Sequence, residues 1–198
     1  MADTGAPHFI PYVEPTDLVR DYPAADEASA FAVAAGLSAA GNAGIGSNVV
    51  QTVKTDTFTT SSTAFTTVTG LSATITPSSD TSKILLIAQI SVSLGNNTGV
   101  GHFRFAGGNT STYVGDPGLS DQVRAVFGGF VNTNVNQFMG SYSLVFLDSP
   151  ATTGATTYTV EARQALDGSV FVNRTKGNSN QEANGRGAST LTVIEVAA

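Results

Sequence analysis

Residues 83–94 read Lys-Ile-Leu-Leu-Ile-Ala-Gln-Ile-Ser-Val-Ser-Leu. From the second position onward every other residue is apolar, which is the period of a β-strand with one face turned into a core. The opposite face is apolar at Leu85 and Ile87 and turns polar at Gln89. We therefore expect a strand that is covered on both sides where it starts and approaches solvent where it ends.

The flanking sequence continues this pattern. Seventeen of the twenty-eight residues in 55–82 are Ser or Thr, but aromatic and β-branched residues recur among them, which favours strands over a disordered stalk. Asp167-Gly168 is typical of a hairpin turn. Eight or nine short strands without helix signals between them predict a mainly β fold, an antiparallel β-sandwich of jelly-roll type. Beyond 83–94, strands are expected at 102–106, 122–131, 137–147, 156–163, 169–174 and 190–196.

Residues 1–47 and residues 48–198 differ in composition. The first part has six acidic residues and one basic residue, a net charge of −5, whereas the second has nine and eight, a net charge of −1. Glycines within 41–46 join the two parts. We therefore expect an N-terminal attachment segment at 1–47 (the leader) with a glycine hinge, and a β-sandwich domain at 48–198 (the body).

Four prolines divide residues 5–23 of the leader into short extended pieces, because each fixes its own backbone and disfavours helix at the residue before it. Apolar side chains lie among them without a local partner. We expect this segment to dock on another protein, and the alternative is a strap across the chain's own body. The candidate docking residues are Phe9, Ile10, Tyr12, Val13, Leu18 and Tyr22.

One short helix is expected after the extended segment. Pro23 suits its first position, nine of the seventeen residues in 24–40 are alanine, and Gly41 is a natural C-cap. A helix of this length is marginal alone in water, so it needs a partner surface. Phe31, Val33 and Leu37 follow an apolar stripe. Self-association into a small bundle and insertion into a larger assembly both fit that stripe.

Catalytic patterns are weak. The only histidines are His8 and His102, and no spacing selects a serine or an acid as a partner for His102. The acids of the body are dispersed, and most of its aspartates, Asp148 among them, stand in contexts typical of turns. The sequence therefore predicts that the protein is not an enzyme.

Composition argues against several kinds of partner. The absence of cysteine removes thiolate metal sites, and no other metal or cofactor motif is present. Neither part has a basic patch, so nucleic-acid binding is not expected. No run of about 20 apolar residues is long enough to cross a bilayer. Residues 1–5 lack the charged and apolar regions of a secretory signal, so we expect synthesis in a cytoplasm.

Glycan binding is the remaining candidate for a small-ligand site. Tyr113 lies near Asn109 and Asp116 in a loop, where an aromatic platform with polar donors suits a sugar, although a turn tyrosine explains the same pattern. The long polar loop at 175–187 is expected to be a flexible tip.

Several separated blocks resemble a β module found widely in tailed bacteriophages and prophages. The blocks occur in the expected order over most of residues 48–198, and the leader at 11–23, followed by its alanine-rich helix, is similar to attachment segments of phage fibre and minor structural proteins. The body blocks are 49–58, 68–79, 82–85, 146–150 with 156–158, and 188–196.

This resemblance implies a virion component, often a homotrimer, with no catalytic residues. The expected function is a short trimeric fibre or spike that binds other virion proteins of the tail, baseplate or capsid through the leader and displays the β-sandwich outward. A host-surface glycan or receptor-binding module and a capsid decoration protein are the alternatives. The expected location is the virion, after synthesis in the bacterial host cytoplasm.

Overall fold

The computed structural model describes residues 31–32, 45–95, 99–110, 125, 127–128, 136–166 and 168–197. The chain divides into two compact units, Met1–Asn42 and Ala43–Ala198. In the first unit, Phe31 and Ala32 are helical. The described part of the second unit is built from ten strands and contains no helix long and apolar enough to cross a membrane.

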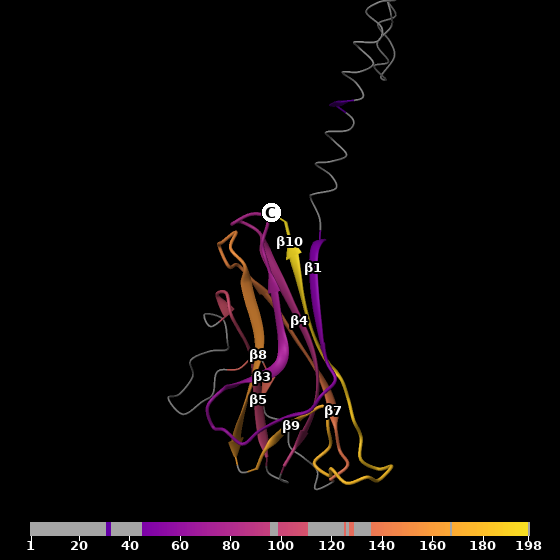
Figure 1. The fold of residues 1–198 in the computed structure, drawn as a ribbon. Helices are drawn as coiled ribbons and strands as arrows, with labels where there is room; N and C mark the ends of the chain where they lie inside the picture. The colour runs from indigo at the N-terminus through magenta and orange to yellow at the C-terminus, as the bar shows by residue number, and fades with distance from the viewer. Residues whose placement is uncertain are drawn as a thin grey trace, which may run out of the picture. The chain divides into compact units, whose positions relative to one another are not determined.

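Six strands form one antiparallel sheet, sheet A (Figure 1). Its order is β1-β10-β4-β9-β2, and β7 pairs with the other edge of β4. Because β9 pairs with residues 92–94 of β4, beyond the last residue that pairs with β10, β9 continues the place of β10 in the sheet. The strands are β1 (Ile45–Lys54), β2 (Phe58–Thr60), β4 (Lys83–Leu94), β7 (Gly140–Asp148), β9 (Val170–Val172) and β10 (Ser189–Val196).

Four strands form the second sheet, sheet B, in the order β3-β8-β5-β6. Its ladders are also antiparallel, and the pairing of β3 with β8 shifts register between Thr67 and Ser72. Gly70 lies in this irregular stretch with a φ of 79°, which glycine adopts without a steric penalty. The strands are β3 (Thr66–Ile75), β5 (Val100–Ala106), β6 (Phe127–Gly128) and β8 (Thr156–Leu166).

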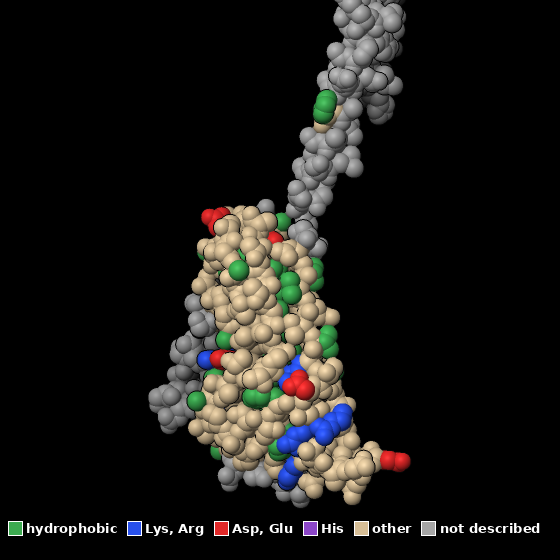
Figure 2. All heavy atoms as spheres, viewed as in Figure 1, with side chains coloured by type: hydrophobic (Ala, Val, Ile, Leu, Met, Phe, Trp, Pro, Cys, Tyr) green, Lys and Arg blue, Asp and Glu red, His purple; other side chains and the backbone are tan. Residues whose placement is uncertain are grey.

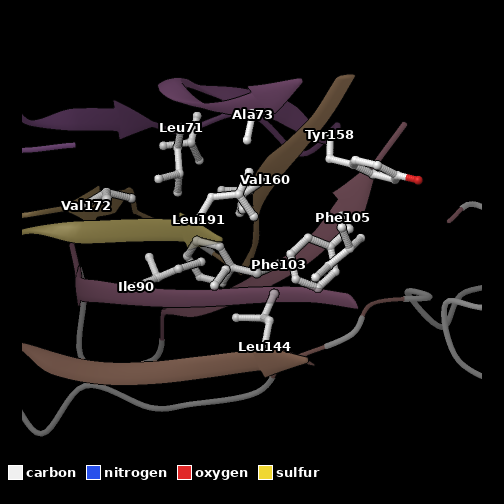
Figure 3. Close-up of a cluster of buried hydrophobic side chains, with 14 of the residues drawn as sticks. Leu71, Ala73, Ile90, Phe103, Phe105, Leu144, Tyr158, Val160, Val172 and Leu191 are labelled. Carbon is white, nitrogen blue, oxygen red and sulfur yellow. The ribbon is translucent and has the colours of Figure 1, made fainter. Parts of the chain in front are cut away.

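The two sheets enclose one apolar core. Figure 3 shows side chains from both sheets meeting in this layer, among them Ile90 and Leu191 from sheet A and Leu71 and Val160 from sheet B. All the apolar residues of β4 that were expected on one face, from Ile84 to Leu94, are buried. The prediction of an antiparallel β-sandwich is thus confirmed.

The predicted hairpin at 167–168 is wrong. β8 before it belongs to sheet B, whereas β9 after it belongs to sheet A and pairs with β4 and β2. The turn, which includes Gly168 at a φ of 115°, therefore carries the chain from one sheet to the other. The chain changes sheets because Val170 and Val172 are buried in the core beyond the last residue pair of β10 with β4. At this place in sheet A, β9 is hydrogen-bonded on both edges, to β2 and to β4.

The two ends of the sandwich are defined by sheet A. At one end the first residue of β1 pairs with Val196, and Val196 pairs with Lys83; we call this the Ile45 end. At the other end β4 finishes at Leu94 beside β9, and we call this the Leu94 end. The leader is joined to the body at the Ile45 end.

Candidate interaction surfaces

A buried carboxyl group lies at the Ile45 end. Asp148 is fully buried as the last residue of β7, not in a turn as predicted. Its Oδ2 accepts hydrogen bonds from the Tyr158 hydroxyl at 2.7 Å and from the Asn109 backbone N–H at 3.1 Å. Burial, together with the hydrogen bond to Asp148, raises the pKa of Tyr158 well above its usual range. This contact joins sheet A to sheet B and leaves the carboxyl group inaccessible to a ligand.

A second buried carboxylate holds the β3–β4 connection at the same end. The Oε1 atom of Glu195 accepts hydrogen bonds from the Ser78 backbone N–H at 2.7 Å and from the Ser78 hydroxyl at 2.6 Å. The Asn48 side-chain amide donates to Oε2 at 3.4 Å. Burial opposes ionisation, but the hydrogen bonds outweigh it and hold the pKa of Glu195 below its usual value. The burial of Glu195 is therefore explained by its structural role in holding the β3–β4 connection.

A third polar cluster is centred on Asn173, which is buried with a φ of 62°. Its amide donates to the backbone oxygens of Lys54 and Asp56 at 2.8 and 2.9 Å, and its Oδ1 accepts from the Ser189 hydroxyl at 2.6 Å. The Lys54 side chain is also buried, and its Nζ lies 2.8 Å from the exposed Asp56 carboxylate. The Lys54 ammonium holds the pKa of Asp56 below its usual range. These contacts hold β9 and β10 against the end of β1.

His102, the only histidine of the body, is placed in β5. Its Nδ1 is buried without a hydrogen-bond partner among the described residues. Burial and then the nearby Arg163 lower its pKa. The neighbouring side chains on sheet B form an ion pair between Arg104 and Glu161 at 2.7 Å, with the Arg104 guanidinium 4.1 Å from the ring centre of Phe65. Within the described ranges, no group of three acids or histidines is arranged to hold a metal ion.

Positive charge gathers at the Leu94 end. Arg174 and Arg186 face each other across an isolated antiparallel bridge. The Arg174 guanidinium lies 3.9 Å from the ring centre of Phe171, and Lys176 follows two residues later. No carboxylate forms a salt bridge with these cations within the described part of the chain. Figure 2 shows a group of Lys and Arg side chains near the lower end of the body. We call Arg174, Lys176 and Arg186 the cationic cluster.

The loop at 175–187, which carries part of the cationic cluster, was expected to be a flexible tip. It is instead held to the body and to itself by many hydrogen bonds. Its backbone is tied to the body where Lys176 N donates to the Ser93 hydroxyl at 3.1 Å and Gly177 N donates to the Asn136 oxygen at 2.8 Å. The Arg186 guanidinium donates to Asn178 Oδ1 at 2.6 Å. Sequence reasoning missed the cluster, because the facing of Arg174 and Arg186 depends on the path of the loop.

Most of the other predicted site residues lie outside the described residues. Among the helix residues, Phe31 is 72% exposed. Of the candidate sugar site, Asn109 is exposed and its amide donates to the Ser149 oxygen at 2.6 Å, which places it at the Ile45 end. The predicted residues outside the described ranges are Phe9, Ile10, Tyr12, Val13, Leu18, Tyr22, Val33, Leu37, Tyr113 and Asp116.

Comparison with known proteins gives distant similarity only. No protein-family model and no curated protein matches the chain. The chain is similar to the structure of infectious bursal disease virus, Gt strain, with 17% identity and a TM-score of 0.38 over 76% of this chain and 38% of that chain. The structure of the Gx strain gives 16% identity and a TM-score of 0.36 over 76% and 37%. The chain spans less than two fifths of those chains, and similarities at this level carry no argument about function.

Proposed function

We propose that this chain is a bacteriophage virion structural protein, a short trimeric fibre or spike. Its leader attaches to other virion proteins of the tail, baseplate or capsid, and its β-sandwich projects outward. The proposal starts from the resemblance of the body blocks and the leader to phage structural proteins, and it gives the chain no catalytic step. Turnover of a substrate that disappears in His102→Ala would contradict that last point.

One observation in the structure carries the proposal: the resembling blocks contact one another through buried structural bonds. Glu195, in the last block, binds Ser78 in the second, and Tyr158 binds Asp148 between the two parts of the fourth. The polar side chains of these blocks form hydrogen bonds that hold the Ile45 end of the sandwich together. Such buried structural contacts support a scaffold that displays a surface rather than a reaction site.

Deletion of residues 1–40 tests the attachment. The expected result is a body that remains folded, by circular dichroism and cooperative thermal unfolding, but that is absent from purified particles. A matched variant with Phe9, Tyr12 and Tyr22 changed to alanine keeps the chain length and is expected to incorporate poorly as well. Normal incorporation of the folded deletion variant would refute the attachment role of the leader. Copy number separates the locations, because a few trimers per particle fit a tail and dozens fit a head.

The cationic cluster favours a second candidate function, binding of an acidic host-surface glycan. Like charges placed opposite each other destabilise a β pair, so Arg174 facing Arg186 is costly without an anion between them. Burial and then the nearby charge of Arg186 lower the pKa of Arg174. A carboxylated or phosphorylated sugar would relieve this repulsion, and the Phe171 ring already packs against the Arg174 guanidinium.

The binding test uses purified full-length protein and arrayed acidic and neutral polysaccharides. The expected result is binding to acidic polysaccharides that weakens with salt and is lost in Arg174→Ala/Arg186→Ala. Lys83→Ala, which removes a cation at the Ile45 end, is the matched control and is expected to bind as the wild type does. Equal binding by the double variant and the wild type would refute this second function.

A further inference from the structure

The outer face of sheet A, turned away from sheet B, is unusually apolar. Register across β1, β10, β4 and β7 aligns its side chains in three rows of four. The first row is apolar in all four strands. The rows are Val49, Ile194, Leu85 and Leu147; then Gln51, Thr192, Ile87 and Val145; then Val53, Thr190, Gln89 and Ser143. We call these twelve residues the outer A face.

Exposed apolar side chains concentrate on this face. Seven large apolar side chains of the described residues are exposed, and four of them belong to it: Val49, Val53, Val145 and Leu147, at 51, 54, 58 and 46%. A contiguous exposed apolar patch on a soluble protein marks a contact surface. The sequence of β4 had indicated cover on both sides at its start, but the core covers only one side. Among the described residues, the other side is therefore a candidate contact surface for a partner.

The charge pattern indicates a copy of the same chain as that cover. None of the twelve residues is charged. Their polar side chains bond within the sheet, since Gln51 Nε2 donates to the Thr192 hydroxyl at 2.8 Å and the Ser143 hydroxyl donates to Gln89 Oε1. When a neutral face whose polar side chains are already hydrogen-bonded packs against the same face of another copy, no like charges are brought together. Sheet B, in contrast, carries a partly exposed ion pair between Arg104 and Glu161.

We propose that the outer A face packs against other copies of this chain in the trimer, an inference that rests on the proposed function. The three rows span about five residues on each of four strands, and at about 3.3 Å per residue and about 4.8 Å between strands this gives roughly 320 Å² of flat area. Stable interfaces bury about 800 Å² on each partner, so the face alone falls short. Other residues must supply the remainder, and Phe31, which is 72% exposed on its helix, is one candidate.

The test compares the wild type with two full-length double variants by sedimentation at a series of concentrations. Val145→Glu/Leu147→Glu places two charges on the outer A face. Ser72→Glu/Thr74→Glu places two charges on exposed positions of β3 in sheet B and is the matched control. The expected wild-type and control mass is three times 20.2 kDa. The outer-face variant is expected to raise the concentration of half-dissociation at least about tenfold, because buried charges would lack partners.

Thiol labelling provides a second measurement that does not depend on charged variants folding. The chain has no cysteine, so Leu147→Cys and the control Ser72→Cys each carry a single thiol. Labelling of Leu147→Cys is expected to slow at least about tenfold as the protein assembles, while labelling of Ser72→Cys stays unchanged. A trimeric wild type with a freely labelled Leu147→Cys, or a folded outer-face variant that dissociates like the wild type, would overturn this inference alone. A monomeric wild type would overturn it together with the trimer.

Discussion

Tyr158→Phe removes one hydroxyl group from the contact that joins the two sheets at the Ile45 end. The hydroxyl lies 2.7 Å from Asp148 Oδ2, and both residues are fully buried. After the substitution, Oδ2 keeps a single donor, the Asn109 N–H at 3.1 Å. Oδ1 has no hydrogen-bond partner among the described residues. The variant therefore leaves a buried carboxyl group less satisfied without changing the aromatic packing.

The expected cost follows from that loss. Leaving a buried polar group without its partner costs about 1–3 kcal/mol, and no cavity large enough for water is created to offset it. For a chain of this size, 1 kcal/mol corresponds to about 2–4 °C in Tm. Tyr158→Phe is therefore expected to lower the Tm by about 2–12 °C. The Asp148→Asn variant, combined with Tyr158→Phe in a double-mutant cycle, should show that the two effects are not additive.

Urea unfolding followed by circular dichroism measures this free energy. Thr159→Val is the matched control, because Thr159 is the next residue of β8. The side-chain hydroxyl that it loses forms no hydrogen bond within the described part of the chain. The control is expected to change the free energy of unfolding by less than about 0.5 kcal/mol. If Tyr158→Phe is as stable as that control, the Asp148 contact does not hold the sheets together.

Three further substitutions test other contacts by the same unfolding measurement. The pKa of Glu195 is lowered from 4.5 in the folded chain, so the stability that the ionised Glu195 gives the fold is present above pH 4.5 and is lost as pH falls through the folded pKa. Glu195→Gln should therefore flatten the dependence of the free energy of unfolding on pH. An unchanged pH profile would contradict this role of Glu195. Gly107→Ala would place a Cβ 2.1 Å from the Thr157 backbone oxygen at a φ of 105°, so it should lower the free energy of unfolding by more than about 1 kcal/mol. Gly154→Ala, a matched change in a turn, should change the free energy of unfolding by less than about 0.5 kcal/mol. Similar values for the two variants would refute the close approach at Gly107. Lys54→Met should change stability by less than about 1 kcal/mol because the partner carboxylate stays hydrated, and a loss above about 3 kcal/mol would show that the ion pair matters more than its geometry suggests.

The sandwich was predictable because its core strands alternate. The bounds predicted for 83–94 match β4, and alternate residues within the strands expected at 137–147 and 156–163 contact the core: Tyr142, Leu144, Phe146, Tyr158, Val160 and Ala162. In these strands the side-chain period alone decides which residues are inside. The fold class therefore required no knowledge of which strands pair.

Features that depend on pairing between distant segments were not predictable. Asp148 looked like a turn former because its local context is all that the sequence displays, but its partner Tyr158 belongs to the other sheet. The turn at 167–168 looked like a hairpin for the same reason, since only the pairing of β9 with β2 and β4 shows that the chain changes sheets.

The interaction surfaces were only partly predictable. The second face of β4 was expected to be covered at its start and to approach solvent at its end, but Leu85 and Ile87 are only half-buried and Ser93 near the end is fully buried. Neither the extent of the outer A face nor its neutrality follows without the register of four strands. The cationic cluster was missed because Arg174 and Arg186 are twelve residues apart and meet only through the path of the loop.

Cleavage of intact particles tests the central claim, that the leader anchors the chain and the body is displayed. A specific protease site inserted between Gly44 and Ile45 lies directly before β1, so the ten described strands of the body remain in one piece after cleavage. After protease treatment and sedimentation of the particles, mass spectrometry locates each part. If the leader anchors the chain, residues 45–198 are released into the supernatant while peptides from residues 1–40 sediment with the particles. Release of the leader peptides, or retention of a fully cleaved body on the particles, would contradict it.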